Sequence, residues 1–120
     1  MYSSCFDEQL QIFRATLTEF VEVNELALGL NECITADYAG ELRALWNIAE
    51  MHVGFALNEV EQVVQVLHAG DVPSGKMAFV IGEKEFLRGV VQSVRSVRDD
   101  WFTQWRVFPR EEDAIAWLTD

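Results

Sequence analysis

The sequence has few basic residues and no long apolar run, and each shortage excludes a class of protein. Nine Lys and Arg residues stand against twenty Asp and Glu, giving a net charge of −11. Nucleic-acid binding needs clustered cations to neutralise phosphates, so we expect no nucleic-acid partner. No apolar run approaches the roughly 18–20 residues that span a bilayer. The first residues also lack the basic and apolar blocks of a signal peptide. We therefore expect no membrane association and a cytoplasmic location.

Cysteine is scarce as well. Cys5 and Cys33 lie far apart in the sequence and match no metal-ligand or redox spacing. In a reducing compartment we expect two free thiols rather than a disulfide. No residue pattern calls for a cofactor.

Apolar residues are abundant, at half of the 120 residues, which is enough for one packed domain over residues 1–120. We expect strands at residues 10–17, 41–49, 76–81 and 102–108, where branched and aromatic side chains gather. Helical spacing follows each strand. We expect the first helix to begin near Thr18 and to bury Phe20. The second should begin after an N-cap at Asn58, with Glu61 completing a capping box. The last helix should follow Pro109. The third helix buries Phe86, Leu87, Val90, Val91, Val94 and Val97.

Strict alternation of strands and helices predicts an α/β fold, a four-turn β-α superhelix with a largely parallel four-stranded sheet. Right-handed crossovers would place all the helices on one face. The other face would then need a cover, which favours self-association.

Three segments resemble those of a known family. Residues 107–118 (VFPREEDAIAWL) are similar to the closing segment of small anti-sigma-factor-antagonist-like proteins, relatives of the STAS domain. Residues 42–47 (LRALWN) and 76–81 (KMAFVI) are similar to two of their strands. The resemblance covers about residues 10–118 and implies a STAS/SpoIIAA-like fold. It also implies binding to a kinase-like regulatory protein partner that phosphorylates a Ser or Thr just after the second strand.

The phosphorylation switch of those relatives has no acceptor here. Asn47 stands where their strand commonly ends in Asp, and no hydroxyl residue occurs between Tyr38 and Ser74. We therefore do not expect this chain to be switched in that way.

Other candidate sites are weak. Asn47, Glu50, Met51 and His52 are expected in a loop at the carboxyl end of the sheet, where ligands of open α/β folds bind. Glu50 and His52, with Glu83 and Glu85, could approach a metal, but their spacing does not make them converge and a solvated loop is favoured. No nucleophile elbow and no Gly-rich phosphate loop occurs, so we expect no enzyme.

Apolar residues outside the expected core give a candidate interface: Val21, Leu28, Trp101 and Trp105. Core packing is the simpler explanation of most of them, although Trp is enriched in interfaces. The sequence thus predicts a non-enzymatic protein-interaction module that forms a homo-oligomer. The alternative is a carrier of a small apolar or lipid-like ligand, with the apolar surplus arranged around a cavity.

Overall fold

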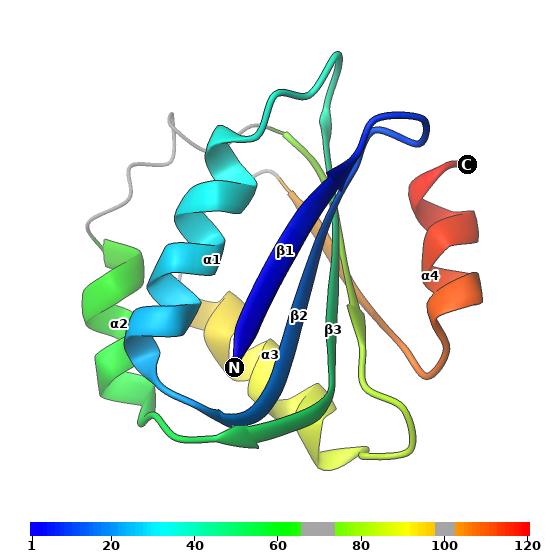
Figure 1. Cartoon of the computed structure of the whole chain (residues 1–120). Helices are drawn as coiled ribbons and strands as arrows, with labels where there is room; N and C mark the ends of the chain where they lie inside the picture. Colours follow the sequence, from blue (N-terminus) through cyan, green and yellow to red (C-terminus); the bar gives the residue numbers. More distant parts are fainter. Residues whose placement is uncertain (66–73, 98–102) are drawn as a thin grey trace.

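The computed structural model describes residues 1–65, 74–97 and 103–120, which form a five-stranded sheet and four helices (Figure 1). The strands are β1 (Tyr2–Asp7), β2 (Ile12–Val21), β3 (Leu42–Val53), β4 (Gly75–Val80) and β5 (Gln104–Phe108). The helices are α1 (Val23–Thr35), α2 (Leu57–Gln65), α3 (Phe86–Val97) and α4 (Glu111–Leu118). None of these helices is long and apolar enough to cross a membrane.

The strands follow one another across the sheet in the order β1-β2-β3-β4-β5. β1 is antiparallel to β2, and every other neighbouring pair is parallel. The predicted α/β fold with a largely parallel sheet is confirmed. The predicted strand count is wrong by one, because β1 (YSSCFD) is too polar to show a strand pattern.

The helices do not all lie on one face, which corrects the arrangement expected from the sequence. α1, α2 and α3 cover one face of the sheet, and α4 lies on the other (Figure 1). The large core lies under α1–α3 around Trp46 and Met77. A smaller core lies under α4 and contains Ile12, Leu45, Ala78, Val80, Phe108, Ala114 and Leu118. The chain therefore supplies much of the cover for its second sheet face by itself.

Two helix starts also differ from expectation. α1 begins at Val23, because residues 18–21 continue β2 and Phe20 is 64% exposed instead of buried. α2 begins at Leu57, two residues earlier than an Asn58 cap allows. The Glu59 carboxylate accepts the Ala56 backbone N–H at 2.9 Å, so Glu59 performs the role predicted for Glu61.

β2 and β3 are the two longest strands and run past the rest of the sheet. β4 pairs with β3 only as far as Asn47, whereas β2 pairs with β3 up to Val21 and Val53. A bulge between Thr16 and Thr18 shifts the register, and Glu19 takes a positive φ of 59°. The final residues of the two strands thus form a two-stranded ribbon that curves away at the lower end of the sheet (Figure 1).

Gly75, where β4 begins, tests this parallel pairing. It has φ +154° and pairs with Leu42, and a Cβ there would lie 2.0 Å from the Leu42 carbonyl oxygen. We expect Gly75→Ala to lower the free energy of unfolding by about 2–4 kcal/mol, from overpacking and backbone strain. Chemical denaturation measures it. Gly40→Ala is the control, since a Cβ there meets nothing within 4 Å. Equal stability of the two variants would contradict this pairing geometry.

Candidate functional site

The four residues predicted to form a loop after the second strand belong to β3 instead. β3 is twelve residues long and carries Asn47, Glu50, Met51 and His52 within it. Met51 is 4% exposed and packs in the large core, so it offers nothing to a ligand. Asn47 is half-buried, and its side-chain oxygen accepts the Ala49 backbone N–H at 3.2 Å. The expectation of a loop is wrong because pairing with β2 keeps these residues extended.

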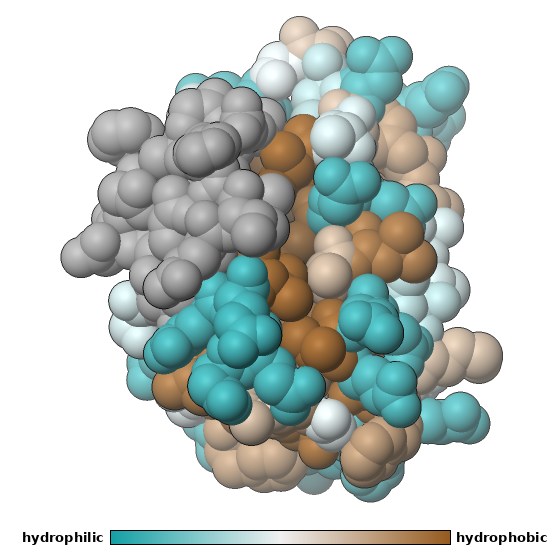
Figure 2. Space-filling view, turned by 90° about the vertical axis from the view of Figure 1, so that its left-hand side faces the viewer, coloured by the Kyte–Doolittle hydropathy of each residue, from teal (hydrophilic) through white to brown (hydrophobic). Residues whose placement is uncertain are grey.

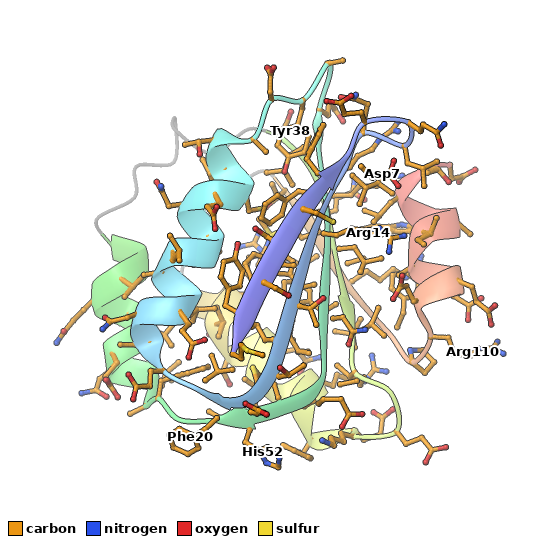
Figure 3. The ribbon with its side chains drawn as sticks, in the orientation of Figure 1. Asp7, Arg14, Phe20, Tyr38, His52 and Arg110 are labelled. Carbon is orange, nitrogen blue, oxygen red and sulfur yellow. The ribbon has the colours of Figure 1, made fainter. Side chains whose placement is uncertain are left out.

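Glu50 and His52 are exposed on the ribbon, where they pair with Thr18 and Phe20 of β2. Figure 3 shows Phe20 and His52 together at the end of the molecule where both strands finish. The other proposed metal ligands do not join them: Glu85 pairs with Arg88 at 3.0 Å. Within the described part of the chain, no three His, Cys, Asp or Glu side chains gather as metal ligands.

The predicted interface residues lie in three different environments. Val21 is fully buried and offers no surface to a partner, which corrects its place in the candidate interface. Leu28 is 53% exposed on α1. Trp105 is half-buried, packs against Phe79 in a tilted arrangement with ring centroids 5.0 Å apart, and donates its indole N–H to the Thr103 hydroxyl. Trp101 lies outside the described residues.

A groove between α2 and α3 is the site that the sequence did not reveal. Its volume is about 410 Å³. Phe86, Leu57 and Val53 stand at it with 64%, 47% and 37% of their surfaces exposed. Among the described residues that line it, Ser93 alone carries a polar side chain. Large exposed apolar side chains gathered in one concave place are typical of a binding site.

The apolar stripe of α3 is wider than its contact with the sheet, and this creates the groove. Leu87 and Val91 are buried against the core, as predicted. Phe86 and Gly89 face the groove on a neighbouring side of the helix. The sequence pattern assigned Phe86 to the core because helical spacing alone cannot separate two adjoining apolar faces.

Behind the groove lies a small cavity of about 50 Å³ between the sheet and helices α1 and α3. The described residues that line it are all apolar and include Leu17, Leu26, Leu30, Trp46, Ile48, Met51, Phe79, Val91 and Trp105. Phe55, Val90 and Val94 line both the groove and the cavity. An apolar lining offers water no hydrogen-bond partner, so this cavity favours an apolar occupant. On the face formed by α1 and α2, apolar side chains gather in a strip flanked by hydrophilic ones (Figure 2).

The two cysteines differ sharply in environment. Cys5 is exposed on β1, and Cys33 is buried on α1. Burial raises the pKa of the Cys33 thiol to about 12, although the neighbouring Tyr38 hydroxyl acts in the opposite direction. That hydroxyl donates to the Cys33 carbonyl oxygen at 2.7 Å, and burial raises the Tyr38 pKa as well. Cys33 is therefore a core side chain rather than a nucleophile.

A solved structure shares this architecture. An uncharacterised protein of the DUF3478 family from Shewanella loihica PV-4, described as having a SpoIIAA-like fold, superposes with a TM-score of 0.59. The match covers 98% of this chain and 93% of that one. This chain has a SpoIIAA-like fold. The two sequences are 14% identical, so the likeness shows the fold alone. No protein-family model and no curated protein matches the sequence.

The different burial of Cys5 and Cys33 leads to a prediction about how fast each thiol reacts. With Ellman's reagent at pH 8, we expect one thiol, Cys5, to react at once in the native protein. Cys33 should react only after unfolding, because its thiolate is scarce and shielded. Counting released thionitrobenzoate with and without denaturant measures both. Immediate reaction of two thiols in the native state would contradict the burial of Cys33.

Proposed function

We propose that this protein is a non-enzymatic binding protein. Its ligand has an apolar hydrocarbon chain, which lies in the groove between α2 and α3. One observation carries the proposal: an exposed apolar groove of about 410 Å³ adjoins a small apolar cavity of about 50 Å³. Phe55, Val90 and Val94 line both spaces, so rotation of their side chains would let the end of a chain pass from the groove into the cavity.

The chemistry of the groove defines the ligand class. Apart from the Ser93 hydroxyl, its described lining offers only apolar surface, so recognition rests on burial of methylene groups. Each buried methylene contributes about 0.8 kcal/mol, which is roughly a fourfold gain in affinity. Affinity should therefore rise with chain length until the groove and cavity are filled. The net charge of −11 disfavours an anionic ligand, so we expect the head of the ligand to be neutral or cationic.

The self-associating interaction module predicted first from the sequence has lost its original argument. That argument required an uncovered sheet face, and α4 packs on that face against Leu45, Ala78 and Phe108. Both the interaction module and the ligand carrier were inferred from apolar residues in excess of one core. In the structure, apolar residues line a groove and a cavity. This placement supports the apolar-ligand carrier over the interaction module. Self-association therefore needs a different surface.

Tryptophan fluorescence tests the proposal directly, because Trp46 and Trp105 line the cavity. A neutral brominated alcohol such as 11-bromoundecanol quenches tryptophan on contact. We expect saturable quenching of part of the emission, reversed by unbrominated undecanol. Trp117 lies on α4, on the far side of the sheet, and should remain unquenched.

Gly89 supplies a matched pair of variants. It lines the groove, and a Cβ at this position meets nothing within 4 Å. We expect Gly89→Phe to fill the groove and weaken binding at least tenfold, while Gly89→Ala binds like the natural chain. Replacing a helical glycine by alanine should also raise the free energy of unfolding by about 0.5–1 kcal/mol.

The measurements are quenching titrations and urea denaturation of all three proteins. Linear, unsaturable quenching in the natural chain would contradict the proposal. So would a Gly89→Phe variant that is folded and binds bromoundecanol with unchanged affinity. A series of alcohols from six to fourteen carbons adds a second criterion: affinity independent of chain length would exclude burial of the chain.

A further inference from the structure

β1 forms an edge of the sheet and has a partner strand on one side only. Met1 and Thr18 exchange both backbone hydrogen bonds, so they form a hydrogen-bonded pair. Such pairs alternate along an antiparallel ladder. The backbone groups of Ser3, Cys5 and Asp7 therefore bond β2, whereas those of Tyr2, Ser4 and Phe6 point away from it. Among the described residues, none bonds these outward groups. Figure 1 shows β1 at the near edge of the sheet.

This edge lacks the devices by which proteins prevent strand addition. Such edges commonly carry Lys, Pro or a bulge. β1 reads Tyr-Ser-Ser-Cys-Phe-Asp, and its pairing with β2 is regular over all six residues. Asp7 is its one charged side chain, in a chain whose net charge is −11. β1 itself thus adds little charge to this edge, and of its flanking acids Glu25 is paired with the Met1 amino group at 3.4 Å.

We propose that two copies of this chain associate by antiparallel pairing of β1 with β1 of the other copy, about a two-fold axis at Cys5. The sheets of both copies then form one continuous sheet. A two-fold axis needs a self-complementary surface, and an antiparallel strand edge is one. The interaction uses backbone groups that the groove between α2 and α3 does not involve, so it is independent of the apolar ligand.

Hydrogen-bond alternation restricts the register. Outward groups belong to even-numbered residues, so an axis at Ser4 pairs Tyr2 with Phe6 and Ser4 with itself, and an axis at Cys5 pairs Ser4 with Phe6. An axis at Ser4 would bring the partner strand beside Tyr2, whose ring packs against α1 at Gly29. An axis at Cys5 leaves Tyr2 outside the paired segment. It also places Ser3 opposite Asp7 of the partner subunit, where the hydroxyl can donate to the carboxylate.

In this register Cys5 meets its own copy as a non-hydrogen-bonded pair. Opposite residues of such pairs have Cα atoms about 4.5 Å apart, which is within the range of a disulfide. The exposed Cys5 thiol is therefore a reporter of the interface, and the buried Cys33 does not interfere. The dimer itself needs no covalent bond and forms under reducing conditions.

Sedimentation equilibrium of the reduced protein from 1 to 100 µM tests the association. We expect a dimer mass at the upper concentrations, with tighter association in 0.5 M than in 0.02 M salt because salt screens the repulsion between acidic copies. Ser4→Pro removes an outward N–H and should give a monomer, whereas Ser4→Ala keeps the backbone group and should remain dimeric. Ser4→Lys offers a second blocked edge if the proline variant is poorly folded by circular dichroism.

Cross-linking tests the register. Copper-phenanthroline oxidises two thiols to a disulfide, accepting two electrons while two protons leave. We expect a covalent dimer that disappears in Cys5→Ser and in Ser4→Pro. A monomer at 100 µM would overturn the proposal. A dimer that survives both Ser4→Pro and Ser4→Lys, or that gives no Cys5 cross-link, would also overturn it. Gly89→Phe should leave the mass unchanged, which separates this outcome from the fate of the ligand proposal.

Discussion

Parallel pairing of β2 with β3 is the constraint on which the rest of the structure depends. These two strands form the centre of the large core, through Phe13, Leu17 and Trp46. They also extend beyond β4, and the ribbon they form fixes where α1 and α2 begin. Gly54 ends the ribbon with its N–H bonded to the Val21 carbonyl at 2.9 Å, so the chain turns directly into Phe55 and α2. The position of one wall of the groove therefore follows from the register of two strands.

The groove arises from an unequal division of apolar residues between the two faces of the sheet. Three helices and a large core occupy one face, and a single short helix covers part of the other. α3 has more apolar surface than the sheet can cover, since Leu87 and Val91 are buried while Phe86 is mainly exposed. Burying that remaining surface would contribute about 25 cal/mol for each Å² removed from water. Without a ligand this apolar surface stays in contact with water, and binding of an apolar ligand would bury it.

Much of the fold could be predicted from the sequence, and the failures have physical causes. β4 and α4 were placed correctly because a continuous apolar run and a cluster of acids after Pro109 are unambiguous signals. β1 was missed because an edge strand half exposed to water needs no apolar pattern. Phe20 was assigned to a helix because its spacing fits 3.6 residues per turn, yet β-sheet pairing with His52 overrides it. The groove could not be predicted, since it depends on the angle between two helices whose sequences show only that each has an apolar side.

The SpoIIAA-like fold shows which residues of this chain lie where the anti-sigma-factor antagonists that the sequence resembles are phosphorylated. In those anti-sigma-factor antagonists, the regulated hydroxyl is expected just after the strand, at the start of the following helix. In this chain the corresponding place is the end of β3 and the start of α2, which supply Val53, Phe55 and Leu57 to the groove. A phosphate there would add about −1.5 to −2 charges and three acceptor oxygens, which an apolar wall could not accommodate. This position carries apolar surface in this chain, and a fold shared with a regulator need not share its function.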